Sequence, residues 1–452
     1  MRQRILLLTV SLAFAGLTVF LGYFAQRSDF YTFIEAYAAS FGLYIWVIFF
    51  AQKQFALHHQ RYLLWLGIGL RVLLLFSIPN LSDDYASFLW DGHLTVAGIH
   101  PFSHPPVYFM DHQIFPTGIS AELFGKLNSQ QYYTVYPPVC QVVFALAAWI
   151  FPTSELGGVV VMKLFLLACE LGTIQLLRSG FREESNFDNF LKVVKVQKNA
   201  ALAYALNPLL ILEISGNCHF EGAMIFFLLA GLVALQENKV AKGAIWWALA
   251  TASKMLPIMF LPIVWRWLGW RKGWIFNIIF AVSCLLLFAP LLAVLPNMLE
   301  SLDLYFQQFQ FNASIYYLVR EVGYHKIGWD IGEFSGPALG GLTLLGIIVI
   351  ALCTRSKSSL AAALLFALLL YLSFSATVQP WYIAVPLALS FLTRWHFAIV
   401  WSGMAALSYS HYLGGGRQEN YGLIGLEYGI LWGFFLWEIW QIFVQKPPVN
   451  SS

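Results

Sequence analysis

Apolar runs long enough to cross a bilayer recur along the whole chain, and they constrain the fold more than any other feature. A membrane-spanning helix needs about 20 such residues. Only 11% of the 452 residues are charged and 59% are hydrophobic, whereas a soluble globular protein carries about 25% charged residues. The sequence therefore predicts an all-α polytopic membrane protein with about 12–14 membrane helices. Twelve of the runs lie at residues 5–23, 31–51, 62–79, 157–177, 200–215, 222–236, 274–295, 337–353, 359–377, 381–393, 396–412 and 424–444.

Two further apolar runs differ from the others. Residues 137–152 are short for a span and begin directly after Tyr136 with two prolines. Residues 243–267 are interrupted at Lys254 to Pro257, where proline cannot continue a helix. We expect the first run to lie along the outer membrane surface and the second to form two half-helices that dip in and out.

The positions of Lys and Arg predict the orientation of the chain. They are concentrated at 178–198 and 266–272, and cytoplasmic loops typically hold such clusters. Placing the N-terminus inside as a retained first helix makes both segments cytoplasmic. The largest outer loops are then 80–135 and 296–336, which we expect to pack together as a lid. No change in composition divides residues 1–452, so we expect one transmembrane domain.

The adjacent carboxylates Asp83 and Asp84 are the strongest candidates for chemistry. They follow the third apolar run, at the start of the longest outer loop. In a poorly solvated cleft two neighbouring carboxylates cannot both ionise freely, and a carboxylate with a raised pKa suits a general base. A helix cap or a solvated turn is the alternative interpretation. Asp91 precedes Gly92, and Asp-Gly is a strong turn signal, so we expect Asp91 to shape a turn that also lies near the substrate.

A second group of ionisable residues surrounds two later breaks in the apolar pattern. Glu213 lies within a run, where an ionisable side chain is costly and suggests function. His219 and Glu221 follow at the outer mouth and could hold Mg²⁺ or Mn²⁺ with a loop aspartate, or form a hydrogen-bond network between helices. Lys254, beside its broken helix, could meet a phosphate as a point charge or pair with Glu213. No cofactor is required by the residues themselves.

Aromatic and amide side chains supply further candidates for binding a sugar. Tyr136 precedes the short apolar run, where a plain helix start is the simpler interpretation. Gln379, Trp381 and Tyr382 surround a proline between two spans, and the tryptophan could instead belong to the interfacial belt. Asn312 lies in the second outer loop, where its amide could bind a hydroxyl.

Taken in order, these motifs resemble the polytopic glycosyltransferases of the C superfamily, which use polyprenyl-phosphate sugars. The chain is similar in particular to the bacterial mannosyltransferase-like membrane proteins of that group. The resemblance extends from about residue 61 to 393. It is carried by Ser82-Asp83-Asp84-Tyr85, Leu89-Trp90-Asp91-Gly92, Gly98-Ile99-His100-Pro101-Phe102, Tyr136-Pro137-Pro138, Asn207-Pro208 with Glu213, Gly216-Asn217-Cys218-His219, Lys254 with Pro257, and Gln379-Pro380-Trp381-Tyr382.

The resemblance implies that the first large outer loop carries a catalytic aspartate, which maps onto Asp83 or Asp84. It also implies attack outside the cytoplasm with inversion at the sugar carbon. Two departures concern phosphate contacts and metal use. Related proteins often have an arginine shortly after the aspartates, where this chain has Ala86-Ser87, and often read Gly-His-Asn or Gly-His-Asp, where this chain has Cys218 to Glu221.

Our hypothesis is an enzyme of the bacterial plasma membrane, a glycosyltransferase with its active site on the non-cytoplasmic side. Mannose is the favoured sugar, a polyprenyl-phosphate sugar the donor, and a hydroxyl of a glycan or lipid the acceptor. Lys254 and His219 are the candidates for stabilising the leaving phosphate, and Glu221 is a further candidate for binding substrate. The rival hypotheses are a lipid-linked sugar flippase or secondary transporter, which would also have broken helices, and a non-enzymatic scaffold. A net charge of +3 without a basic arm gives no indication of nucleic-acid binding.

Overall fold

Helices account for most of the described residues. The computed structural model describes residues 2–50, 57–180, 199–307, 309–328, 331–355, 359–415 and 418–444. Within these ranges the only extended pairing is a bridge between Phe311 and Thr377. The all-α prediction is therefore confirmed. Most of the basic segment 178–198 lies outside the described residues.

Six described helices are long and apolar enough to cross a membrane, which confirms a polytopic membrane protein. They are Ile5–Phe24, Phe30–Phe49, Glu155–Ser179, Trp270–Ser301, Phe334–Cys353 and Tyr421–Val444. A further span is bent by 114° between Pro208–Gly216 and Glu221–Gln236. These are fewer than the 12–14 expected, because prolines and short breaks leave other apolar runs as shorter helices. Those helices are Pro138–Ile150, Leu256–Leu268, Leu360–Phe374 and Pro380–Ser390.

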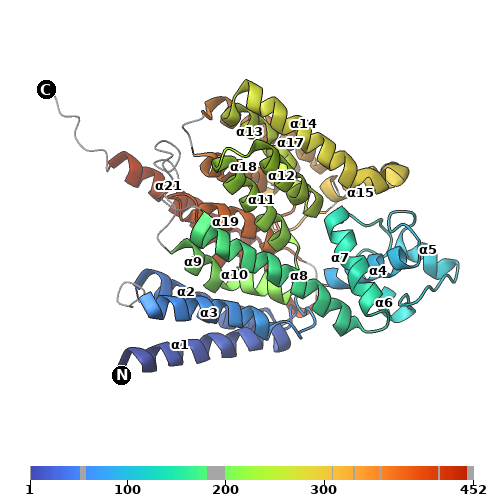
Figure 1. Cartoon of the computed structure of the whole chain (residues 1–452), viewed down its shortest axis with the longest axis horizontal. Helices are drawn as coiled ribbons and strands as arrows, with labels where there is room; N and C mark the ends of the chain where they lie inside the picture. Colours follow the sequence, from blue (N-terminus) through green and yellow to red (C-terminus); the bar gives the residue numbers. More distant parts are fainter. Residues whose placement is uncertain are drawn as a thin grey trace.

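The first half of the chain forms the N-terminal helices and one end of the molecule. α1 contacts both α2 and α3, and α4 to α7 gather at the end opposite the C-terminus (Figure 1). The helices are α1 (Arg2–Val19), α2 (Phe30–Ile45), α3 (Leu57–Leu73), α4 (Asp84–Val96), α5 (Pro106–Asp111), α6 (Ala121–Gly125), α7 (Pro138–Ile150), α8 (Glu155–Gln175), α9 (Ala200–Leu206) and α10 (Pro208–Leu210), followed by the π-helical turn η5 (Ile211–Gly216).

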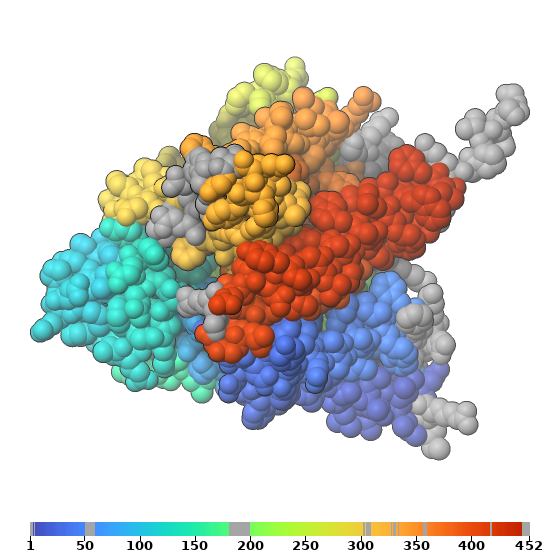
Figure 2. Space-filling view, turned by 180° about the vertical axis from the view of Figure 1, so that it is seen from behind, coloured from blue at the N-terminus to red at the C-terminus, as the bar shows by residue number. Residues whose placement is uncertain are grey.

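The second half supplies the remaining long helices. Figure 2 shows α21, in red, crossing the face opposite to that of Figure 1. The helices are α11 (Glu221–Gln236), α12 (Val240–Ser253), α13 (Leu261–Leu268), α14 (Trp270–Phe288), α15 (Leu295–Gln307), α16 (Ile315–Ile327), α17 (Gly332–Cys353), α18 (Leu360–Phe374), α19 (Ala384–Ser390), α20 (Phe397–Met404) and α21 (Tyr421–Val444). The predicted break at Lys254 is present: α12 ends at Ser253, and the 3₁₀ turn η6 (Leu256–Phe260) leads into α13.

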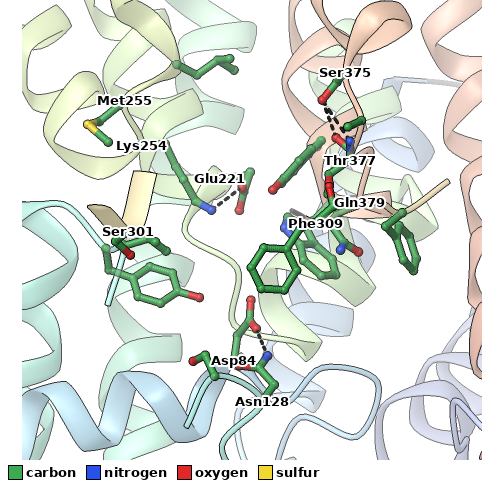
Figure 3. Close-up of a pocket in the computed structure, with 18 of the residues that line it drawn as sticks. Asp84, Asn128, Glu221, Lys254, Met255, Ser301, Phe309, Ser375, Thr377 and Gln379 are labelled. Carbon is green, nitrogen blue, oxygen red and sulfur yellow. Dashed lines mark hydrogen bonds and ion pairs between the residues drawn. The ribbon is translucent and has the colours of Figure 1, made fainter. Parts of the chain in front are cut away.

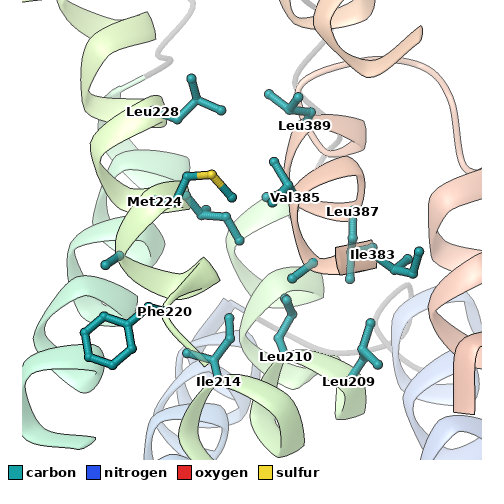
Figure 4. Close-up of a cluster of buried hydrophobic side chains, with 14 of the residues drawn as sticks. Leu209, Leu210, Ile214, Phe220, Met224, Leu228, Ile383, Val385, Leu387 and Leu389 are labelled. Atoms are coloured by element: carbon teal, nitrogen blue, oxygen red, sulfur yellow. The ribbon is translucent and has the colours of Figure 1, made fainter. Parts of the chain in front are cut away.

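An aliphatic core supports the bend between η5 and α11. Figure 4 shows Met224 of α11 facing Val385 of α19, with Ile214 of η5 below them. Each of these side chains is at most 1% exposed. Interiors packed this tightly transmit strain and hold side chains in single positions. The bend and the start of α19 are therefore fixed relative to each other.

The two predicted outer loops are in contact. The Nδ2 of Asn297 in α15 donates to the Phe102 carbonyl at 2.7 Å, and Ser301 Oγ donates to the Tyr133 carbonyl at 2.9 Å. Because loop 80–135 and the start of α15 share these hydrogen bonds, they enclose space between them.

Candidate active site

A cavity of about 990 Å³ opens where the two outer loops meet the ends of the central helices. Its wall includes every sequence-predicted site residue except His219 and Asn312. Those lining it are Asp83, Asp84, Asp91, Tyr136, Glu221, Lys254, Gln379, Trp381 and Tyr382. Residues almost 300 positions apart in the sequence therefore meet around one space, in the arrangement typical of a ligand pocket.

Asp83 and Asp84 have different partners. Asp83 is the N-cap of α4, but its side chain makes no cap hydrogen bond; instead it forms an ion pair with Arg27. The cap is supplied by Ser82, whose Oγ accepts from the Asp84 backbone N–H at 3.3 Å. Asp84 Oδ1 accepts from Asn128 Nδ2 at 2.9 Å. Asp83 is thus already neutralised by a cation, whereas Asp84 is held by a neutral amide.

His219 lies just behind Asp84. Its Nε2 is 3.9 Å from Asp84 Oδ2 and 3.3 Å from Ser82 Oγ. Its Nδ1 is 3.2 Å from Oε2 of the buried Glu213, although the direction does not satisfy hydrogen-bond geometry. The imidazole stacks on the Trp381 ring at a centroid distance of 3.8 Å. His219 therefore lies between the partly exposed Asp84 and the buried Glu213. It does not line the cavity itself, contrary to the expectation for a substrate-binding residue.

The backbone at Cys218 adopts a conformation that glycine favours, although this chain has cysteine there. Cys218 has φ of 65°, in the left-handed region that glycine adopts most readily. This is the position where related proteins often have glycine. The turn separates η5 from α11 within the 114° bend, so this backbone conformation directs His219 toward Asp84.

Lys254 and Glu221 form an ion pair across the cavity from Asp84 (Figure 3). Their Nζ and Oε1 atoms are 3.0 Å apart, with 26% of the lysine and 3% of the glutamate side chain exposed. Glu221 begins α11, and Lys254 sits at the break after α12. The Lys254 Nζ also lies 5.8 Å from the Tyr136 ring centroid and 5.9 Å from that of Tyr382. The lysine therefore pairs with Glu221, not with Glu213, and remains partly open to the cavity.

The expectation of a turn at Asp91 is wrong, because Asp91 lies inside α4. Gly92 serves close packing instead: a Cβ there would lie 2.2 Å from the Phe144 carbonyl oxygen of α7. Asp91 Oδ2 accepts hydrogen bonds from Thr134 Oγ1 and, at 2.8 Å, from Gln141 Nε2. Burial raises the pKa of Asp91 to about 7, although both hydrogen bonds act to lower it.

Asn312 does not reach the cavity wall. It is 2% exposed, and its Nδ2 donates to Glu427 Oε2 of α21 at 3.1 Å. The amide therefore satisfies a buried carboxylate instead of binding a hydroxyl. Its backbone neighbour Phe311 does line the cavity and is fixed there by the bridge to Thr377.

The predicted metal ligands have other partners in this arrangement. Glu221 is paired with Lys254, and His219 is placed between Asp84 and Glu213. Among the described residues, no group of three or more His, Cys, Asp or Glu side chains has an arrangement that could hold a metal ion.

Arg27 and Asn128 were not identified from the sequence. Arg27 comes from the connection between α1 and α2, 56 residues before its partner Asp83, and its guanidinium carbon lies 4.8 Å from the Tyr412 ring centroid. A single basic residue in a short loop carries no local signal of this pairing. Arg27 thus supplies a cation beside the aspartates from another loop.

Comparison with known proteins identifies the family. Residues 23–269 match the model of the family described as alpha-(1->6)-mannopyranosyltransferase, N-terminal domain. The chain is also similar to Alpha-(1->6)-mannopyranosyltransferase A of Mycobacterium tuberculosis, with 24% identity over 371 residues, covering 73% of this chain and 68% of the relative. The matched region contains Arg27, the aspartate pair, His219 and Lys254. The chain therefore belongs to the alpha-(1->6)-mannopyranosyltransferase family, as a membrane glycosyltransferase.

Proposed function

We propose that this protein transfers mannose from a polyprenyl-phosphate donor to a hydroxyl of a glycan or lipid acceptor, on the non-cytoplasmic face of a bacterial plasma membrane. The main supporting observation is that Asp84 and the Lys254–Glu221 pair face the same 990 Å³ cavity. The activity for which the mycobacterial relative is named supports an α-(1→6) linkage. An α product formed with inversion requires a β-linked mannosyl phosphate.

The wall of the cavity beyond Lys254 favours a lipid-linked donor. It contains a mostly apolar set from the α12–α13 connection and one face of α17: Met255, Leu256, Ile258, Met259, Gly336, Pro337, Gly340, Thr343, Leu344 and Ile347. The α17 residues recur three to four positions apart, as one helix face does. Only 22% of the apolar stretch within Phe334–Cys353 of α17 is buried. This wall therefore adjoins a helix that would face lipid. An isoprenoid chain could lie here with its phosphate near Lys254.

In the proposed reaction Asp84 acts as the general base. As the acceptor oxygen attacks the anomeric carbon, its proton passes to a carboxylate oxygen of Asp84, and the bond between that carbon and the phosphate oxygen breaks. The transition state resembles an oxocarbenium ion. Polyprenyl phosphate leaves with the electron pair of the broken bond. Asp84 is the better base of the two because Asp83 is engaged by Arg27.

Lys254 and His219 have separate functions in this mechanism. The Lys254 ammonium would stabilise negative charge developing on the leaving phosphate, a type of electrostatic effect that is among the largest in enzymes. Glu221 keeps that cation in place. We assign His219 a positioning function, because its distance to Asp84 and its stacking on Trp381 connect the base with the sugar-facing wall.

A donor panel tests this proposal. Purified protein in detergent is incubated with radiolabelled polyprenyl-phosphate mannose, the glucose and galactose analogues, and GDP-mannose, each with a membrane lipid extract as acceptor. We expect label transfer only from polyprenyl-phosphate mannose. Parallel reactions with EDTA determine whether a divalent cation is needed. Transfer from GDP-mannose but not from the lipid donor would reject the donor assignment, and transfer from neither would reject the activity.

A further inference from the structure

One face of α4 continues the cavity wall beyond Asp84. Asp84, Ser87 and Asp91 are spaced three and four residues apart, so they share a helix face, and all three line the cavity. Seven residues advance an α-helix by about 10 Å, which is longer than one sugar ring. The general base and Asp91 therefore lie at two separate points along the same wall.

Three residues that neighbour Asp91 along α4 or bond to it have polar atoms without partners. Trp90 Nε1, Ser87 Oγ and Gln141 Oε1 are buried and have no hydrogen bond within the described residues. Trp90 is 1% exposed and lines the cavity beside Asp91. Buried polar groups are rarely left unpaired, and each such group needs an explanation. Ser87 and Trp90 line the cavity, so their unpaired atoms indicate a bound molecule that offers a donor and an acceptor, as sugar hydroxyls do.

The Asp91 carboxylate also retains binding capacity. Both of its side-chain hydrogen bonds end on Oδ2, which leaves Oδ1 for a donor from a ligand. Tyr136 lies near both carboxylates and lines the same cavity; burial first and then the charges of Asp84 and Asp91 raise the pKa of its hydroxyl. Its ring packs edge-on against Phe88 of α4 at a centroid distance of 4.7 Å. An aromatic ring and two carboxylates on one cavity wall are well suited to a chain of sugar rings.

We propose that Ser87, Trp90 and Asp91 form a subsite for the second sugar residue of a glycan acceptor. The terminal residue of that glycan would present its hydroxyl to Asp84, and the residue before it would occupy the subsite. The preferred acceptor then has at least two sugars. This inference rests on the proposed function and adds the minimum length of its acceptor.

A purely structural function for Asp91 makes a different prediction. Through Thr134, Asp91 connects α4 to the segment before α7, and through Gln141 it connects α4 to α7 itself. If this were its only function, its loss would lower transfer to short and long acceptors by the same factor. A subsite would instead change the ratio between them.

The test compares two synthetic acceptors, octyl α-mannoside and its α-(1→6)-linked dimannoside, using polyprenyl-phosphate mannose as donor. We expect the wild type to have a higher kcat/KM for the dimannoside. Asp91→Asn and Trp90→Phe should each reduce that preference about tenfold, the effect of one lost hydrogen bond to a well-oriented group. Thr95→Val is the matched control: its Oγ1 bonds only the Asp91 carbonyl, and it should keep the wild-type ratio.

Direct binding separates failure of the subsite from failure of the proposed chemistry. Tryptophan fluorescence is titrated with the dimannoside in Asp84→Asn, which lacks the base, and in Asp91→Asn. We expect binding to persist in Asp84→Asn and to weaken in Asp91→Asn. An unchanged acceptor ratio in both subsite variants, or equal binding by all proteins, would overturn the inference whether or not Asp84 proves catalytic.

Discussion

The ion pair of Lys254 and Glu221 allows stability and catalysis to be separated. Replacing Lys254 with Met leaves a carboxylate that is 3% exposed without its cation. Breaking a buried pair typically costs about 3–5 kcal/mol. Since 26% of the lysine side chain is exposed, we expect about 3 kcal/mol, the lower end of that range. The double variant Lys254→Met with Glu221→Gln removes the uncompensated charge and should recover most of this loss.

Transfer should not recover with stability. If the Lys254 ammonium stabilises the leaving phosphate, both the single and the double variant should lose about 10²–10³-fold in kcat. Free energies of unfolding come from reversible unfolding in mixed detergent micelles, and rates from single-turnover assays. Lys239→Met is the control, because its pair with Glu237 is about half exposed on both sides and should contribute less than about 1 kcal/mol. A double variant as unstable as Lys254→Met would refute the pairing argument, and one with wild-type transfer would refute the phosphate assignment.

Three further predictions concern α4 and the second outer loop. Gly92→Ala should destabilise by about 1–3 kcal/mol and reduce transfer, because its Cβ would meet the Phe144 carbonyl oxygen at 2.2 Å; a melting curve equal to wild type would contradict this. Burial raises the pKa of Asp91 to about 7, above the unfolded value of about 4, so the folded protein holds that proton more tightly and loses stability as pH rises from 4 through 7. The melting temperature of Asp91→Asn relative to wild type should therefore rise between pH 5 and 8, and a pH-independent difference would rule this out. Asn312→Ala should cost about 1–3 kcal/mol by removing a donor from buried Glu427 while leaving the KM of both substrates unchanged; a raised KM would return Asn312 to the site.

Hydropathy was sufficient to predict the fold class but not the number of uninterrupted spans. Runs of apolar residues identify the segments that must be buried in the membrane or the protein core, yet they do not reveal where a helix bends. The break at Lys254 was visible because Pro257 follows it. The break around Cys218 was visible as the gap between runs 200–215 and 222–236, but its 114° bend was not, since a non-glycine residue with positive φ depends on tertiary contacts.

The candidate site was predictable where charge stands out against an apolar background. Asp84, Glu221 and Lys254 were identified for that reason, and the structure places all three around one cavity. Asp91 was misassigned because the Asp-Gly signal was outweighed by close packing of α4 on α7. Arg27 was missed because its partner lies 56 residues away, and no local pattern encodes that distance.

Single-turnover transfer by Asp84→Asn and Asp83→Asn, with polyprenyl β-mannosyl phosphate as donor, tests the assignment of the base most directly. Asparagine keeps the shape of the side chain but cannot accept the proton. We predict a loss of about 10²–10⁴-fold in Asp84→Asn, with donor binding retained, and a clearly smaller loss in Asp83→Asn. A rate near wild type in Asp84→Asn, in a protein that is folded and binds donor, would contradict the account.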